Sequence, residues 1–386
     1  MNILIIARGT PSKCDPQWGS FEFDQAKALV ELGHHVSIAS VDTRFRFYWR
    51  TLGLTIENKS KIRTYNYFCC PLAIIGLLGK RLKELILKWQ WKQIESAILK
   101  ENVHYDIIYS HYLFNSYNAI QWLTRLNAPV VAIEHWSALN QNPLPHEVEQ
   151  MAKYTYSHVT KLLTVSHQLQ KRISELFNAH SEVVNNMISP QYTYEKKVTP
   201  SICSFISVGS LRHLKGFDTL IKAFTIANLP KGEWALQIVG SGEEMLHIQQ
   251  LIHQYQLSDY VQLLGQKNAQ DIASLLNRSN AFILASRSET FGVVYIEAMA
   301  CGLPVIATQC GGPEEFVTDK NGLLVPVDNV EKLAEAIKYM FHHYQEYNRQ
   351  AIADDCQARF SSEVIAKQLT EIFEDVVAKF HRNTTN

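Results

Sequence analysis

The hydrophobic residues of the chain fall into short apolar runs that alternate with segments of helical spacing. Residues 3–7 form an apolar run, 20–32 have apolar positions at helical spacing, and 36–40 resume as an apolar run. The same order recurs later, where the run 202–208 precedes a helical segment at 217–226. Because parallel strands need a helical crossover between them, this alternation predicts repeated strand–helix–strand units. We therefore expect an α/β protein with two doubly wound, Rossmann-like domains.

The length of the chain indicates the number of domains, and its charge balance limits the classes of binding partner. The chain has 386 residues, more than one hydrophobic core usually serves, so two domains are expected. Lysine and arginine total 37, as do aspartate and glutamate, which argues against nucleic acid as a partner. The polar, aperiodic segment 190–201 is typical of a linker. We expect an N-terminal domain at 1–190, a C-terminal domain at 202–361 and a closing helix within 362–386.

The cysteines and the hydropathy favour a cytoplasmic protein. The seven cysteines include no Cys-x-x-Cys arrangement, which suggests reduced thiols and no zinc site. No span reaches the roughly 18 uninterrupted apolar residues of a membrane helix. The N-terminus is typical of a strand and lacks the features of a secretory signal.

One stretch, residues 286–305, carries the strongest candidate chemistry. The apolar run 281–285 enters it as a buried strand, and Gly302 and Pro304 end a helix within it. That helix is apolar nearly all round, and Glu297 is the exception. A lone carboxylate there needs hydrogen-bond donors, which either a sugar or ribose diol or an Arg or Lys of the chain would supply. Both interpretations remain open at this point.

The loop before this helix offers an anion site. Glu289 lies in the loop, eight positions before Glu297. Backbone N–H groups of Phe291, Gly292 and Val293 stand at the N-terminus of the helix, where N–H groups and the helix dipole bind phosphates. The loop therefore predicts a phosphate site flanked by two carboxylates.

The stretch Ser286–Ala307 resembles the signature of the retaining glycosyltransferases of the GT-B fold, the large group 1 family typified by sucrose synthase. That signature has two glutamates separated by seven residues, which Glu289 and Glu297 match, and the segment Gly311–Glu315 also matches. The resemblance implies two domains facing a central cleft, with the donor held mainly by the second domain and the acceptor by the first. It also implies that the closing helix crosses back to the first domain.

The resemblance further implies the activity. A sugar would pass, with retention at its anomeric carbon, from a UDP- or GDP-sugar to a glycan or lipid-linked acceptor, as in bacterial surface polysaccharide or lipopolysaccharide synthesis. The nucleotide sugar is a co-substrate, so no cofactor is expected. Phe291, Gly292 and Val293 would hold the diphosphate, which makes a divalent metal unnecessary. Glu289 would orient the sugar hydroxyls as a catalytic residue, and Glu297 would bind the ribose.

Further donor contacts in the second domain follow from the same resemblance. Lys215 matches the lysine of the family and would stabilise the departing diphosphate as a catalytic residue. Ser210 holds the position of the family's arginine, and Arg212 is our candidate for the same phosphate. Gln266 would lie beside the nucleobase.

Two histidines follow predicted strands in the first domain. The strand at 106–109 leads to His111 and the strand at 130–133 leads to His135. Ligands bind at the carboxyl ends of strands in open α/β sheets. The resemblance assigns His111 to the sugar and acceptor site as a catalytic residue, and it places His135 and Asn186 in the same pocket.

The loop after the first strand departs from the family pattern. The family has two adjacent glycines there, and this chain has Trp18 followed by Gly19. The resemblance implies that Gly19 lets the backbone approach the donor phosphate, whereas its spacing alone is equally typical of a turn glycine.

A basic amphipathic segment lies upstream of residue 100. The apolar run 70–79 is followed by Lys80, Arg81, Lys83 and Lys88, which alternate with apolar residues at helical spacing. Such a helix either docks on an anionic membrane surface or packs on the sheet with a solvated lysine face. The first interpretation would make the protein peripheral on the inner face of the cell membrane.

Two other functions remain open. One is a subunit that binds sugar nucleotides without turnover. Trp18 and Ser210, which differ from the family pattern, favour this function, whereas the intact Lys215 and the two glutamates argue against it. A sugar-nucleotide 2-epimerase of the same fold would cleave the donor without an acceptor. Donor turnover with and without acceptors distinguishes these functions from transfer.

Overall fold

The computed structural model describes residues 1–44, 50–69, 79–196 and 202–384. The chain divides into two compact units. One unit contains Met1–Asn185 and Ser362–Asn386, and the other contains Asn186–Ser361.

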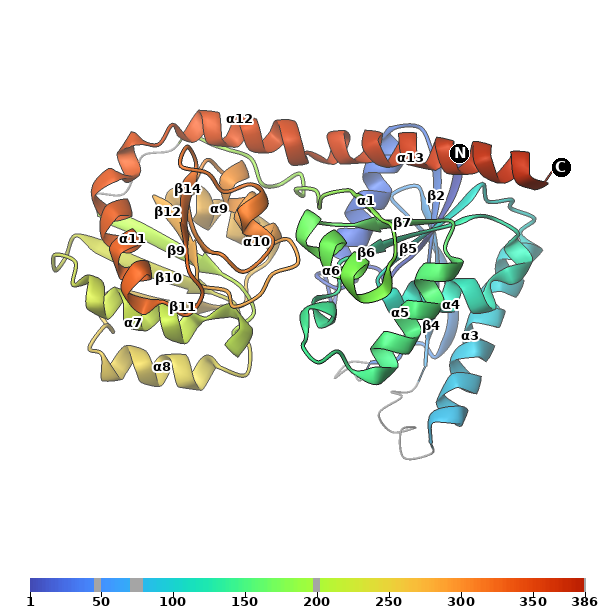
Figure 1. Ribbon diagram of the computed structural model, residues 1–386, viewed down its shortest axis with the longest axis horizontal. Coiled ribbons are helices and arrows are strands. Elements are labelled where there is room, and N and C mark those ends of the chain that lie inside the picture. Colours follow the sequence, from blue (N-terminus) through green and yellow to red (C-terminus); the bar gives the residue numbers. More distant parts are fainter. Residues whose placement is uncertain (45–49, 70–78, 197–201, 385–386) are drawn as a thin grey trace. The chain divides into compact units, whose positions relative to one another are not determined.

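The first unit is an eight-stranded sheet flanked by helices (Figure 1). Its strands are β1 (Asn2–Ile6), β2 (His35–Asp42), β3 (Gly53–Lys59), β4 (Ile62–Phe68), β5 (Ile107–His111), β6 (Val130–Glu134), β7 (Lys161–Thr164) and β8 (Glu182–Val183). Its helices are α1 (Ser20–Glu31), α3 (Lys80–Lys100), α4 (Leu113–Trp122), α5 (His146–His158), α6 (His167–Phe177) and α13 (Ser362–Thr384). The strand order is β3-β4-β2-β1-β5-β6-β7-β8, and all pairs are parallel except β3 with β4.

Both faces of this sheet are covered by apolar side chains. Leu4 and Ile6 of β1 pack in one buried cluster with Trp91 and Ile94 of α3. This burial on both faces explains why β1 is a continuous apolar run instead of an alternating one. The C-terminal helix α13 belongs to the same unit, where the ring of Phe373 lies 5.0 Å from that of Tyr109.

The hairpin of β3 and β4 is a feature that the sequence pattern did not predict. The two strands are joined at Ser60 and Lys61, which have φ values of 50° and 65°. Hairpin turns of this kind usually carry Asn-Gly or Asp-Gly, so a Ser-Lys pair gives no turn signal. The aromatic segment just upstream, 45–49, and most of the apolar run 70–79 lie outside the described residues.

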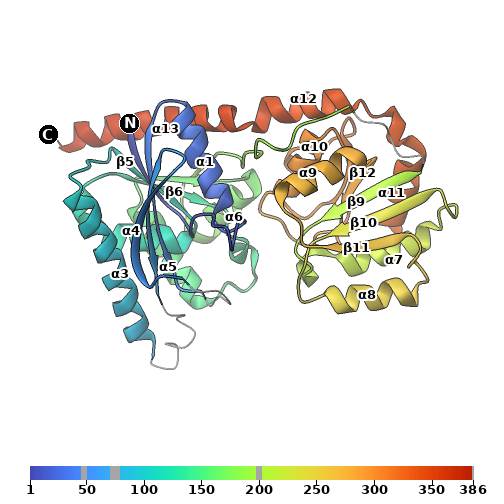
Figure 2. The same ribbon diagram turned by 180° about the vertical axis from the view of Figure 1, so that it is seen from behind.

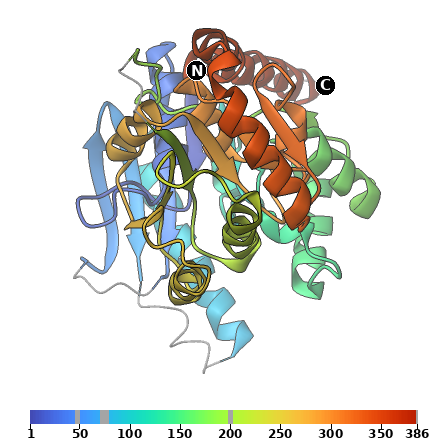
Figure 3. The ribbon, with the colours of Figure 1, turned by 90° about the vertical axis from the view of Figure 1, so that its left-hand side faces the viewer.

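The second unit is a six-stranded, fully parallel sheet of order β11-β10-β9-β12-β13-β14. Its strands are β9 (Cys203–Val208), β10 (Trp234–Val239), β11 (Val261–Gly265), β12 (Ala281–Leu284), β13 (Val305–Thr308) and β14 (Gly322–Val325). Its helices are α7 (Phe217–Ala227), α8 (Met245–Gln254), α9 (Ala269–Arg278), α10 (Val293–Ala300), α11 (Val330–His343) and α12 (Arg349–Phe360). Figures 1 to 3 show these helices on both faces of the sheet.

The segment expected as a linker, 190–201, begins inside the second unit. Gln357 donates from Nε2 to the carbonyl of Tyr192 at 3.1 Å, and Asn277 donates from Nδ2 to the carbonyl of Thr193 at 2.9 Å. These side-chain hydrogen bonds hold a segment without hydrophobic periodicity. The pattern of apolar residues therefore could not predict that the segment belongs to the second unit. The division therefore falls at Asn185 and Asn186, before both Pro190 and residue 202.

Each sheet has a point where the strand order reverses. In the first unit β1 lies between β2 and β5, and in the second β9 lies between β10 and β12. Ligands bind at the carboxyl ends of strands at such points. The prediction of two doubly wound, Rossmann-like α/β domains is confirmed. Among the described residues, no helix has both the length and the apolar character needed to cross a membrane.

Candidate functional site

The second unit brings Lys215 and Glu289 into direct contact. Lys215 ends the short 3-10 turn His213–Lys215 after β9, and Glu289 lies in the loop between β12 and α10. The Nζ of Lys215 donates to Oε1 of Glu289 at 2.5 Å, and the hydroxyl of Ser286 donates to the same oxygen at 2.7 Å. The two predicted catalytic residues of this unit therefore meet at the carboxyl edge of the sheet.

A glycine makes this approach sterically possible. Gly216 follows Lys215 with φ of 63°, and a Cβ atom on it would lie 1.9 Å from the carbonyl oxygen of Ala285. Only a residue without a side chain lets the start of α7 pack this closely against the end of β12.

The predicted anion site lies at the N-terminus of α10. The ring of Phe291 is buried against Phe316 and Phe360, with ring centres 5.2 Å and 5.7 Å away, so its side chain anchors the loop. Gly292 has φ of 95° and Val293 begins the helix. The N–H groups of the first helical turn have no acceptor within a helix, which leaves them able to bind an anion.

Glu297 lies one turn into α10 and is partly buried. Burial raises its pKa to about 8, and a hydrogen bond from the side chain of Tyr192 opposes that rise. The partner that the sequence left open, an Arg or Lys, is not among the causes of this shift. A carboxyl group that is this costly to ionise is prepared to accept hydrogen bonds from added hydroxyl groups.

The other two predicted donor contacts of the second unit, Arg212 and Gln266, are exposed. Arg212 precedes the 3-10 turn, and its side chain has no hydrogen-bond or ion-pair partner within the part of the chain that the structure describes. Gln266 follows β11, two strands away from β9 in the sheet. Within the described ranges, no three His, Cys, Asp or Glu side chains group as metal ligands.

Sequence reasoning missed Arg287, which lies two residues before Glu289. Its side chain pairs with Asp218 of α7 and with Asp328 after β14. The signal was present as an arginine inside the signature stretch, but its partners come from distant segments.

In the first unit, His111 is fully buried at the end of β5. Neither ring nitrogen has a hydrogen-bond partner among the described residues. Burial, with a smaller effect of the Arg8 charge, lowers the pKa of His111 to about 3. The ring is therefore neutral near pH 7, and its donor and acceptor nitrogens are both without a partner in the described ranges.

His135 lies beside His111, with ring centres 5.4 Å apart, and stacks on Tyr112 at 4.0 Å. The structure thus joins the two predicted histidines in one aromatic cluster. Tyr112 has φ of 69°, a left-handed conformation that a bulky residue rarely adopts. Arg8 stands over its ring and pairs with the buried Glu22 at 2.8 Å.

Glu134 is a second residue that sequence reasoning passed over. This buried carboxyl group at the end of β6 accepts from the backbone N–H groups of His135 and Trp136, both at 2.9 Å, and from the Tyr156 hydroxyl at 3.0 Å. Burial raises its pKa to about 7, and these hydrogen bonds oppose the rise. Glu134 therefore fixes the turn that carries His135.

Gly19 is held in close packing with another glycine. It has φ of 71°, and a Cβ atom on it would lie 2.1 Å from the carbonyl oxygen of Gly9. Trp18, which replaces the first family glycine, donates from Nε1 to the carbonyl of Arg8 at 2.9 Å. Asn186, the first residue of the second unit, is buried, and its Oδ1 has no partner within the described residues.

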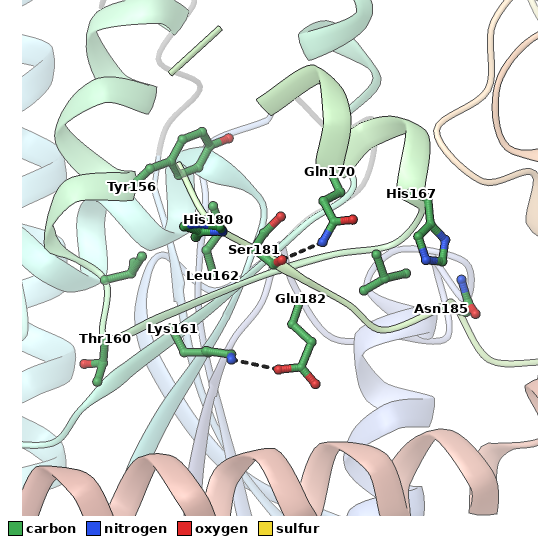
Figure 4. Close-up of a pocket in the computed structure, with 12 residues that line it drawn as sticks. Tyr156, Thr160, Lys161, Leu162, His167, Gln170, His180, Ser181, Glu182 and Asn185 are labelled. Carbon is green, nitrogen blue, oxygen red and sulfur yellow. Dashed lines mark hydrogen bonds and ion pairs between the residues drawn. The ribbon is translucent and has the colours of Figure 1, made fainter. Parts of the chain in front are cut away.

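The first unit has two pockets, which differ in how close they lie to the predicted site residues. A pocket of about 740 Å³ follows the sheet edge between α5, α6, β7 and β8, where Lys161 pairs with Glu182 and Gln170 bonds to Ser181 (Figure 4). None of the predicted site residues lines it. A smaller pocket of about 330 Å³ includes Gly9 and Trp18 and lies at the carboxyl ends of β1, β2 and β4.

Comparison with known proteins agrees with this geometry. The model of glycosyl transferases group 1 matches residues 203–354, and that of Glycosyltransferase Family 4 matches residues 23–192. The chain is 26% identical over 369 residues to N-acetyl-alpha-D-glucosaminyl L-malate synthase of Bacillus anthracis, covering 91% of this chain and 92% of that protein.

Solved structures agree on the fold. Sucrose-phosphate synthase from Thermosynechococcus elongatus superposes with a TM-score of 0.80 at 20% identity, covering 98% of this chain and 100% of the other. HepE of Anabaena in complex with UDP superposes with a TM-score of 0.72 at 18% identity, covering 97% and 99%. With family models matching both halves of its length, the chain belongs to the group 1 glycosyltransferases of the GT-B fold.

Proposed function

We propose that the protein is a retaining glycosyltransferase that moves a sugar from a nucleotide-sugar donor to a glycan or lipid-linked acceptor without a divalent metal. The contact between Lys215 and Glu289 carries this proposal. It puts a cation and a carboxylate at one edge of the sheet, in the loop system that ends at the N-terminus of α10. A diphosphate leaving group needs the cation and the N–H groups, and the hydroxyls of a sugar need the carboxylate.

The reaction follows from these groups. The bond between the anomeric carbon and the diphosphate oxygen breaks, and the acceptor oxygen bonds to that carbon on the same face. The acceptor proton passes to the departing diphosphate. Lys215 and the N–H groups of Gly292 and Val293 stabilise the charge that develops on the diphosphate, Arg212 adds a second cation, and Glu289 orients the sugar.

The remaining residues extend this assignment. Glu297 accepts hydrogen bonds from the ribose, and Gln266 lies beside the base. His111, His135 and Asn186 are assigned to the sugar and the acceptor, and the neutral ring of His111 can hydrogen-bond a hydroxyl. A donor of the UDP type is supported by the UDP complex of HepE, a protein of the same fold.

A donor screen followed by turnover assays tests the proposal. Thermal shift across UDP-, GDP- and ADP-sugars identifies the donor, because a ligand that binds only the folded state raises the unfolding temperature. Donor turnover is then measured with and without glycan and lipid-linked acceptors. Acceptor-dependent turnover with an unchanged anomeric configuration is the expected result. Turnover that ignores the acceptor would indicate the epimerase, and donor binding without turnover would indicate a binding subunit.

The acceptor and the location belong to the same proposal. A lipid-linked acceptor of surface polysaccharide or lipopolysaccharide synthesis would bring a cytoplasmic enzyme to the inner face of the cell membrane. The first turns of α3 support this location, because Leu85 and Trp89 are 61% and 55% exposed. Arg81, Lys83 and Lys88 are exposed beside them, and each such charge contributes about 1 kcal/mol near an anionic surface.

Liposome binding tests this location. The protein should bind anionic but not neutral liposomes, leave them at high salt, and lose binding when Lys80, Arg81, Lys83 and Lys88 become Gln. The side chain of Lys80 lies outside the described residues. Lys→Gln changes at the exposed Lys332 and Lys338 of α11 serve as the matched control, which should bind as wild type. Binding that ignores lipid charge would contradict the membrane location and favour a soluble acceptor.

A further inference from the structure

The loop that carries Glu289 is tied to other segments through the guanidinium group of Arg287. Its Nη1 and Nη2 donate to the two carboxylate oxygens of Asp218, each at 2.9 Å. Nη2 also donates to Oγ1 of Thr219 at 3.1 Å, and Nε pairs with Oδ1 of Asp328 at 2.8 Å. Every nitrogen of the group thus has a partner, and the bidentate arrangement with Asp218 is the most directional form of ion pair.

This network lies largely out of water. The side chains of Arg287 and Asp218 are only 15% and 16% exposed. Burial alone would raise the pKa of Asp218, but the hydrogen bonds and charge of Arg287 keep it below its usual value. The pair is therefore ionised at neutral pH. Because a shielded, bidentate pair tolerates little rotation, it fixes the position of the loop.

The same arginine reaches the segment that presents Lys215. Its backbone N–H donates to the carbonyl of Leu214 at 2.8 Å, and Nη1 donates to the carbonyl of His213 at 2.5 Å. Lys215 is the next residue of that turn, and it meets Glu289 on the other side. Arg287 therefore joins the two segments whose charged groups come together in the site.

We propose that Arg287 is a positioning residue of the diphosphate site, which holds Lys215 and Glu289 in place without touching the donor. This inference rests on the proposed function, because it states how Lys215 is kept where the departing diphosphate needs it. Displacing a reacting group by about 1 Å can cost roughly 100-fold in turnover. A lysine at this position would keep the charge but lose the planar, bidentate geometry.

Steady-state kinetics of Arg287→Lys test the proposal. The variant should lower kcat about 10- to 100-fold and raise the donor KM by no more than about tenfold, because the displaced Lys215 also holds the diphosphate of the bound donor. Arg278→Lys, the same change at an exposed arginine ending α9, is the matched control and should behave as wild type. Added methylguanidinium should restore part of the turnover of Arg287→Ala, which a general loss of stability would not allow.

A binding measurement tests the positioning role of Arg287 without relying on turnover. Isothermal titration compares UDP with UMP, and GDP with GMP, to obtain what the second phosphate adds to affinity. Arg287→Lys should weaken diphosphate binding about tenfold and leave monophosphate binding unchanged, since only the group held in place by Arg287 is displaced. If the Arg287 variants do not fold, Asp218→Asn removes the charge of the opposite partner, and the same results are expected.

The two proposals fail in different ways. Wild-type turnover together with wild-type diphosphate affinity in Arg287→Lys would overturn the positioning role, even if the variant unfolds at a lower temperature. Wild-type protein without turnover on any nucleotide sugar would contradict the proposed function. In that case the diphosphate affinity of the variant still decides whether Arg287 positions Lys215.

Discussion

If Glu297 binds the ribose as proposed, its raised pKa makes nucleotide binding depend on pH in a definite direction. Its pKa is raised to about 8 in the free protein, so the carboxyl group is mainly protonated at neutral pH. A carboxylate that accepts two ribose hydroxyls is stabilised in its ionised form, which lowers the pKa in the complex. Donor binding therefore releases a proton, and affinity must rise as the pH increases towards 8.

The size of the effect follows from the ionised fraction. With a pKa of about 8, roughly 1% of the free protein is ionised at pH 6 and about half at pH 8. If only the ionised form accepts the ribose, the apparent Kd tightens about 50-fold over this range, equal to about 2.3 kcal/mol.

Isothermal titration with an intact nucleotide sugar at several pH values measures this slope. Nucleotide sugars suit the assay because their phosphates remain ionised throughout the range. Glu297→Gln should bind more weakly at pH 8 and show no slope, whereas Glu331→Gln, a change at an exposed glutamate of α11, should keep it. An affinity that stays constant between pH 6 and pH 8 in wild type would refute the assignment of Glu297 to the ribose.

Four further outcomes are expected. Lys215→Ala should lower turnover by roughly two to three orders of magnitude while leaving the circular dichroism spectrum unchanged, and near wild-type turnover would exclude the assigned role. Activity should survive excess chelator, and a loss restored by magnesium or manganese would contradict the metal-free site. Gly216→Ala should destabilise the fold in urea by more than about 1 kcal/mol beyond Gly232→Ala, because both glycines have positive φ but only Gly216 faces a carbonyl at 1.9 Å. The pKa of Glu134 is raised to about 7, so its contribution to stability is full below the ordinary carboxyl pKa and is lost as the pH rises through 7. Glu134→Gln should therefore flatten this part of the pH profile of the unfolding temperature. A profile that is unchanged in the variant would argue against this role of Glu134.

The parts of the fold with a strong hydrophobic period could be predicted from the sequence. The strands β1, β9 and β12 are buried on both faces, so each is a short apolar run, and the sequence locates them to within one or two residues. The hairpin at Ser60 and Lys61 could not be predicted, because its strands are partly exposed and its turn residues lack the usual signal.

The candidate site also has one part that the sequence could predict and one that it could not. Lys215 and Glu289 could be named from the sequence because each follows a predicted strand and matches the family pattern, but their direct ion pair depends on how the two loops fold together. Arg287 was missed because its partners lie far away in the sequence, and Glu134 was passed over because its burial at the end of β6 appears only in the fold. Asp218, for example, is 69 residues from Arg287, and no local pattern reports such a distance.

The assignment of α13 to the first unit makes that unit discontinuous in the sequence. Leu369, Phe373 and Val376 are buried, and the unit that they help to fill begins at Met1. A chain emerging from the ribosome therefore presents all of Asn186–Ser361, an uninterrupted segment, before the N-terminal unit has received its last helix. Domains fold as units during synthesis, so the second half of this protein can reach its native state first. Meanwhile the apolar surface that α13 covers in the complete first unit stays exposed on the nascent N-terminal segment.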